Sequence, residues 1–93
     1  MNNQRFNSVW DAVEDTRDQA AMMELRSALL IALKAHIVRA KLSQADAAQL
    51  LGVTQPRVSD LMRGKINLFG LDTLVNMSSA AGLQIELKIL EPQ

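Results

Sequence analysis

The sequence predicts an all-α domain that carries one β-strand at its C-terminal end. Three features support this: a long segment without glycine or proline, a pair of short capped helices, and a final segment whose hydrophobic residues alternate. A chain of 93 residues, 48% of them hydrophobic, is long enough for one folded domain with one core.

A single long helix is predicted from about Asp18 to Lys41, because the segment contains strong helix formers and no helix breaker. Its largest apolar residues recur every four positions: Leu25, Leu29, Leu33 and Ile37. This spacing places them on one face, which should pack on a core. Residues 1–18 are more polar and acidic, and we expect an N-terminal arm there, partly ordered, in which Ser8 could cap a turn or two of helix.

Two short helices follow, and each has a recognisable start. Ser43 is placed to cap a helix that runs to Leu51, and Gly52 can adopt the positive φ that ends it. Thr54 is placed to cap the next helix, with Pro56 in its first turn, where a missing N–H costs nothing. We expect this second helix to end near residue 64.

A fourth helix is predicted over residues 71–81, after Gly70 and before Gly82. The chain then alternates apolar and polar residues as LQIELKIL, which is a strand pattern. A lone strand leaves its backbone groups unsatisfied, so we predict antiparallel pairing with the same strand of a second chain. A two-fold axis at Leu87 would place Glu86 opposite Lys88. The predicted dimerisation residues are Leu83, Ile85, Glu86, Leu87, Lys88 and Ile89.

The two short helices and their glycine turn match the helix-turn-helix unit. Counted from Gln44, Ala48 is the fifth residue, where a small side chain lets the helices cross closely, and Gly52 is the ninth, at the turn. Val58 and Leu61, the fifteenth and eighteenth, should fix the second helix on the core. The opposite face of that helix is polar and should remain in solvent: Gln55, Arg57, Ser59 and Asp60.

This polar face predicts binding to double-stranded DNA. In a helix-turn-helix, the N-terminal residues of the second helix reach base edges in the major groove. Arginine suits guanine and glutamine suits adenine, so we expect Arg57 and Gln55 to read bases, with Ser59 and Asp60 as lesser candidates. The residues placed for the DNA backbone are Gln44, Thr54, Arg63 and Lys65, and Pro56 belongs to the same predicted surface.

The charge distribution agrees with this prediction although the formal net charge is zero. Residues 25–65 carry seven basic and two acidic side chains, a balance of +5. Residues 1–24 carry five acidic and two basic side chains (−3), and residues 66–93 carry three acidic and one basic (−2). The positive charge is therefore concentrated in the segment that holds the motif.

The stretch SQADAAQLLGVTQPRVSDLMRGK resembles the helix-turn-helix of Cro/C1-type (XRE) regulators. With NSVWDAV before it and AAGLQIEL after it, the wider chain is similar to the HigA-like antitoxin branch over about residues 8–90. The resemblance implies a lambda-repressor-like bundle of about five helices that dimerises and represses its own operon. It also implies neutralisation of a ribonuclease toxin encoded beside it, in a type II toxin-antitoxin system. Residue 70 is a glycine where this family often has serine, which affects only the start of the fourth helix.

The resulting prediction is a cytoplasmic homodimeric repressor that is nucleoid-associated when bound to a palindromic operator. Its parts are the arm (1–18), the helix-turn-helix domain (19–82) and the dimerisation strand and tail (83–93). The alternatives are a stand-alone regulator without a toxin, or a protein-interaction module. The acidic N-terminal residues could meet a basic toxin, although a solvated face is the commoner explanation.

Other functional classes find little support in the sequence. No catalytic constellation is recognisable, so we expect no enzyme and no cofactor. The absence of cysteine, together with a lone His36, predicts no metal site, and it suits a cytosolic protein. The N-terminus lacks a signal-peptide pattern, and the longest apolar run is too short for a membrane span.

Overall fold

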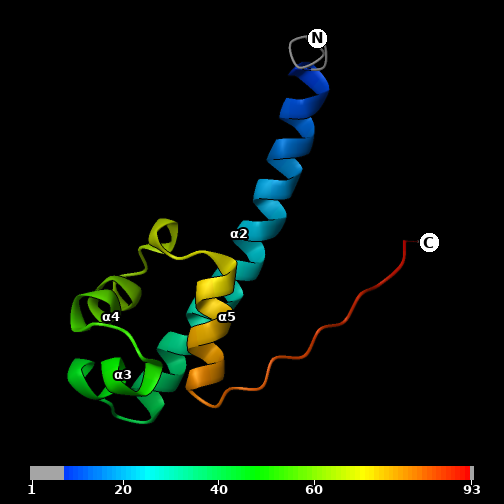
Figure 1. The fold of residues 1–93 in the computed structure, drawn as a ribbon. Helices are drawn as coiled ribbons and strands as arrows, with labels where there is room; N and C mark the ends of the chain where they lie inside the picture. Colours follow the sequence, from blue (N-terminus) through cyan, green and yellow to red (C-terminus); the bar gives the residue numbers. More distant parts are fainter. Residues whose placement is uncertain (1–7, 93) are drawn as a thin grey trace.

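The structure, a computed structural model, describes the backbone of residues 8–92 and the side chains of residues 17–92. All regular secondary structure within these residues is helical (Figure 1). The elements in chain order are α2 (Ser8–Arg39), α3 (Gln44–Leu51), α4 (Gln55–Met62), the 3₁₀ turn η1 (Ile66–Leu68) and α5 (Leu71–Ala80). The described part thus has four α-helices and one 3₁₀ turn, where the resemblance implied about five helices.

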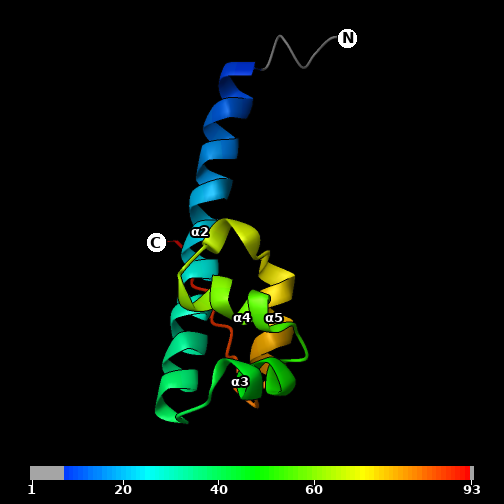
Figure 2. The same cartoon turned by 90° about the vertical axis from the view of Figure 1, so that its left-hand side faces the viewer.

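Helix α2 begins at Ser8, whereas the sequence predicted a start near Asp18. The residues expected to form a separate arm are therefore helical from position 8 onward, and the first seven lie outside the described residues. The reason is that each further residue adds one hydrogen bond to an existing helix, and nothing before position 18 interrupts it. The first half of α2 extends beyond the rest of the domain (Figures 1 and 2). The radius of gyration is accordingly 16.9 Å, against about 12 Å for a compact chain of this length.

The second half of α2 supports the other helices. Helix α5 packs beside it, while α3 packs on α4 across the end of the bundle (Figures 1 and 2). Leu33, Val58, Leu61, Phe69 and Leu74 are fully buried. The rest of the core is Leu30, Ile37, Ala47, Ala48, Leu51 and Met77. Each α-helix therefore contributes at least two residues to one core, and Ala48 is buried, as expected for a small residue where two helices cross closely.

The local signals around α3 are confirmed. The Ser43 hydroxyl accepts a hydrogen bond from the Asp46 amide at 3.0 Å. At the other end Gly52 has φ 70° and ψ 34°, the left-handed conformation that glycine adopts without a Cβ penalty. The Val53 amide donates to the Ala48 carbonyl at 3.0 Å, and the Gly52 amide to the Gln49 carbonyl at 3.4 Å. These two bonds are a Schellman motif, and it sets the direction in which the chain enters α4.

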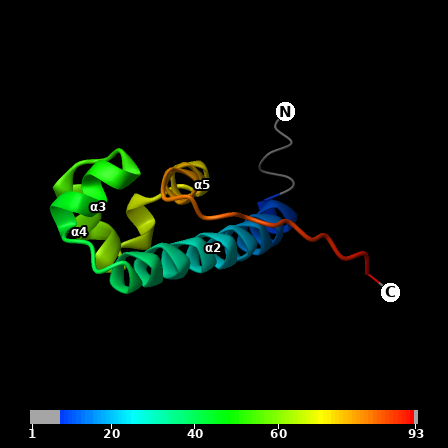
Figure 3. The same ribbon diagram turned by 90° about the horizontal axis from the view of Figure 1, so that it is seen from below.

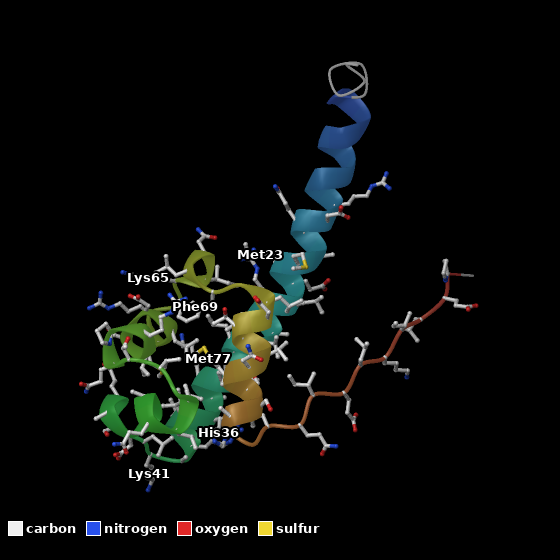
Figure 4. The ribbon with its side chains drawn as sticks, viewed as in Figure 1. Met23, His36, Lys41, Lys65, Phe69 and Met77 are labelled. Carbon is white, nitrogen blue, oxygen red and sulfur yellow. The ribbon has the colours of Figure 1, made fainter. Side chains whose placement is uncertain are left out.

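Two features at other helix ends were not predicted from the sequence. Helix α2 ends in the same hydrogen-bond pattern as α3, but the left-handed residue is Lys41, with φ 56° (Figure 4 labels Lys41 at this turn). The turn η1 lies between α4 and α5, and Phe69 follows it directly. Helix α5 starts at Leu71 without a side-chain cap, as expected from Gly70, and ends at Ala80.

The C-terminal segment after Gly82 runs away from α5 as an extended chain, and residues 83–92 form no β-strand (Figures 1 and 3). The sequence predicted a strand here, but only in combination with a second copy. A strand exists through its hydrogen bonds to a neighbour, and the described part of one chain supplies no other strand. No helix among the described residues is both long enough and apolar enough to cross a membrane.

Candidate nucleic-acid interface

Helix α4 presents its N-terminal turn to solvent. The side chains of Thr54, Gln55 and Pro56 are exposed, while Val58 and Leu61 on the opposite face are fully buried. The Thr54 hydroxyl accepts a hydrogen bond from the Arg57 amide at 3.3 Å, so the first turn is held by a side-chain cap. The structure therefore places Gln55 at an open, capped helix start, where a base edge could approach it.

Ser59 and Asp60 lie farther along α4 and are partly buried. The Asp60 carboxylate pairs with the Lys65 ammonium at 3.6 Å. An ion pair this exposed contributes little to stability. Its position matters more, because it links α4 to the turn that follows and places a positive charge beside α4.

The residues predicted for the DNA backbone lie around α4. Gln44 is exposed at the start of α3, and Arg63 and Lys65 are exposed in the segment after α4. Thr54 precedes α4 directly. Lys65 keeps 48% of its side-chain surface in solvent despite its pairing with Asp60. The structure thus places Thr54 before α4, with Arg63 and Lys65 after it, which suits contact with phosphates on either side of a groove. Gln44 lies apart from them in the chain, at the start of α3.

Arg57 differs from the expectation that it would project freely into solvent. Its side chain is partly buried, and its Nη2 atom donates a hydrogen bond to the Leu68 carbonyl at 2.7 Å. The guanidinium carbon lies 4.4 Å from the centre of the Phe69 ring, a cation–π contact. The guanidinium is therefore turned toward η1, and Gln55 is the more open of the two predicted base readers.

The other members of this contact, Phe69 and Arg26, are not among the residues predicted for the site. Phe69 is fully buried beneath Arg57 (Figure 4 labels it beside η1), and its own carbonyl accepts a bond from Arg26 Nη1 at 3.4 Å. Arg26 lies on α2, forty-three positions earlier. No local pattern signals a contact between residues this far apart, so only the fold could reveal it.

The predicted dimerisation segment lies beside an apolar groove of about 450 Å³ between α2 and α5. Its lining includes Leu25 and Leu29 of α2, Val75 of α5, and Ile85 of the C-terminal segment. The segment becomes more exposed as it leaves the groove, reaching 81% at Leu87 and 80% at Ile89. Leu83 is partly buried, while Glu86 and Lys88 are exposed.

The described residues contain no cluster of three or more histidine, cysteine, aspartate or glutamate side chains that could hold a metal ion. His36 is partly buried on α2 (Figure 4 labels it).

Two short capped helices, a left-handed glycine between them and an open polar start to the second helix define a DNA-binding helix-turn-helix protein. Residues 12–90 match the family described as "Helix-turn-helix domain", and the chain belongs to that family.

One solved structure extends the comparison. It is named "Putative XRE Family Transcriptional Regulator" and shares 36% sequence identity with this chain. The match has a TM-score of 0.74 and covers 80% of this chain and 83% of the other. A comparison with curated proteins gives no match. The chain is thus a helix-turn-helix transcriptional regulator of the XRE type, a DNA-binding class.

Proposed function

We propose that the protein is a sequence-specific repressor that binds a palindromic operator as a homodimer, in the cytoplasm. The observation that carries the proposal is the open N-terminal turn of α4, where Gln55 is exposed beside the Thr54 cap. In this arrangement α4 lies in the major groove and Gln55 contacts base edges, with Ser59 and Asp60 farther along the same helix. The contacts with phosphate come from Gln44, Thr54, Arg63 and Lys65.

Selection of duplexes from a random DNA pool, followed by titration of the enriched sequence, tests this directly. We expect an inverted repeat whose half-sites lie about one helical turn apart, because two α4 helices related by a two-fold axis must enter successive major grooves about 34–36 Å apart. Gln55→Ala should relax the preference at one base pair of each half-site. Enrichment of no common sequence would refute sequence-specific binding.

Dimerisation through the C-terminal segment is the second part of the proposal. The segment alternates apolar and charged residues, and its most exposed apolar side chains are Leu87 and Ile89. Antiparallel pairing of two such segments about Leu87 would satisfy their backbone groups and bring Glu86 opposite Lys88 twice. The groove between α2 and α5 opens beside the same segment, so the second chain would cover both.

A charge exchange distinguishes this pairing from other dimers. Glu86→Lys alone would put like charges opposite each other, and the dimer dissociation constant should rise by about fivefold or more. The double variant Glu86→Lys, Lys88→Glu restores opposite charges in the same register, and its dissociation constant should return toward the original value. Sedimentation equilibrium measures all three. If the double variant dissociates as readily as the single one, the register is wrong.

We also propose that this repressor is the antitoxin of a type II, HigBA-like toxin-antitoxin system that regulates its own operon. The supporting observation is the N-terminal part of α2, which extends beyond the domain (Figure 1) and carries the exposed side chains of Asp18 and Glu24. An exposed acidic helix could bind a basic ribonuclease. Co-expression with a small basic protein encoded in the neighbouring reading frame tests this: a stable complex that suppresses its toxicity is expected. If the protein encoded in the neighbouring reading frame neither binds this chain nor is toxic, the alternative of a stand-alone regulator is favoured.

A further inference from the structure

The Leu68–Phe69 segment is held by arginines from two different helices. Arg57 of α4 donates to the Leu68 carbonyl at 2.7 Å, and Arg26 of α2 donates to the next carbonyl, that of Phe69, at 3.4 Å. The Phe69 ring is fully buried and lies under the Arg57 guanidinium, 4.4 Å away. Two consecutive carbonyls and one ring therefore fix the place where the chain passes from η1 into α5.

The Arg57 contact combines two interactions that use different parts of the guanidinium. One nitrogen donates a charge-assisted hydrogen bond, and the guanidinium carbon lies over an aromatic ring, so two separate interactions restrain the position of the group. Arginine suits this role because its rigid fork of donors and its planar face act together. A side chain that turned away to reach a base edge would lose both interactions.

The contact also joins the two parts of the interface. Helix α4 carries Gln55 and Thr54, and the segment from Arg63 to Leu68 carries the basic side chains predicted for phosphate. This segment leaves α4 through Gly64, which has φ 75°, and reaches η1 within a few residues. The Arg57–Leu68 bond spans eleven positions and closes this loop onto the first turn of α4.

We infer that Arg57 is a positioning residue and not a base reader: through Phe69 and the Leu68 carbonyl it fixes the basic segment 63–68 relative to α4. The base contacts made by α4 and the phosphate contacts made by the segment are then held at a fixed spacing from each other. This inference rests on the proposed DNA binding. It assigns Gln55 the role of the principal base reader, and it gives Phe69 an influence on DNA affinity without contact with DNA.

The first test needs no DNA. Hydrogen exchange of the whole protein is compared for the wild type, Arg57→Met and Arg57→Lys. Methionine keeps an apolar stem over Phe69 but removes the charge and the donors, whereas lysine keeps the charge and one donor centre. The amides of Leu68 and Phe69, which bond to the Lys65 and Ile66 carbonyls, should exchange about tenfold faster in Arg57→Met. In Arg57→Lys the exchange rates of these two amides should return part of the way to the wild-type values. The exchange rate of the Ala47 amide of α3 should be the same in all three proteins. Unchanged exchange at η1 would overturn the inference.

The second test measures affinity for the duplex selected by the wild-type protein and for its single base-pair variants, over a range of salt. A positioning role predicts that Arg57→Met weakens binding to every duplex by about the same factor, roughly tenfold, because the free segment must be ordered again on binding. The order of base preference is preserved, and so is the salt slope, because Arg63 and Lys65 keep their charges and still reach phosphates in the complex. Arg17→Met removes an exposed charge from α2 and serves as the matched control.

Two other outcomes contradict the inference. A loss confined to one base pair, of about 5- to 150-fold, would identify Arg57 as a base reader. A uniform loss with a salt slope flatter by about one unit would identify it as a phosphate contact. If the wild-type protein selects no sequence, the proposed function fails, while the exchange measurement still decides whether Arg57 holds η1.

Discussion

The turn between α3 and α4 sets the direction of α4, and Gly52→Ala tests how much the geometry of this turn contributes to stability. Gly52 has φ 70°, and a Cβ built on it would have no neighbouring atom within 4 Å. The substitution therefore causes no clash, and its cost is the left-handed backbone alone, about 1–2 kcal/mol for an L-residue. The lower entropy of the unfolded alanine chain offsets about 0.4–1 kcal/mol of this. We expect a net loss of about 1 kcal/mol, or a Tm lower by about 4–8 °C.

The turn after α2 supplies the opposite experiment. Lys41 has φ 56° in the same hydrogen-bond pattern, with its amide bonded to the Val38 carbonyl at 3.1 Å. Lys41→Gly should remove the left-handed strain and raise the free energy of unfolding by up to about 1 kcal/mol. Gly70→Ala is the control, because Gly70 has φ −73° and therefore no left-handed strain; its added Cβ would lie 3.0 Å from Asp72 Oδ1, which accepts a hydrogen bond from the Thr73 amide and must shift slightly.

Thermal and urea unfolding followed by circular dichroism measures all three variants. The expected order of stability is Lys41→Gly above the wild type and Gly52→Ala below it, with Gly70→Ala close to the wild type. If Lys41→Gly and Gly52→Ala shift the midpoint in the same direction, left-handed strain does not control these turns and the reasoning is refuted.

Two further predictions concern the DNA contacts and the core. Arg63→Ala and Lys65→Ala should each weaken binding to all DNA sequences and reduce the slope of log affinity against log salt by about 0.9, as measured by fluorescence anisotropy; an unchanged slope would exclude them as phosphate contacts. Leu74→Ala should lower the free energy of unfolding by about 2–5 kcal/mol in urea titrations, because Leu74 is fully buried and its truncation leaves a cavity. A loss below about 1 kcal/mol would mean that the core closes around the smaller side chain and that no cavity forms.

The sequence was most informative where a structure depends on neighbouring residues. Ser43 and Thr54 cap helices as predicted, and Gly52 adopts the left-handed conformation, because a cap or a Schellman motif involves only a few consecutive positions. The spacing from Gln44 also predicted the burial of Ala48, Val58 and Leu61. These features were sufficient to identify the helix-turn-helix.

Features that depend on distant residues could not be predicted in this way. The start of α2 at Ser8 depends on propagation of the helix from its C-terminal half, which is held in place by packing on the core. The contact between Arg57 and Phe69 joins positions that share no periodic pattern, and the η1 turn that brings them together is only three residues long. The prediction that Arg57 reads bases followed from residue type and position alone, and the fold supplies a competing partner for the same guanidinium.

The C-terminal segment has the sequence pattern of a strand, but residues 83–92 form no strand in the single chain. Its alternation of apolar and charged residues has the period of a strand, yet its chain is extended and unassigned to any sheet, with Leu87 and Ile89 about four-fifths exposed. Burial of each such side chain stabilises an assembly by about 1.5–3 kcal/mol, and a two-fold axis doubles every contact. A monomer loses this stabilisation entirely. The same pairing that completes the strand would also set the separation of the two α4 helices. DNA binding and dimer formation should therefore change over the same range of protein concentration.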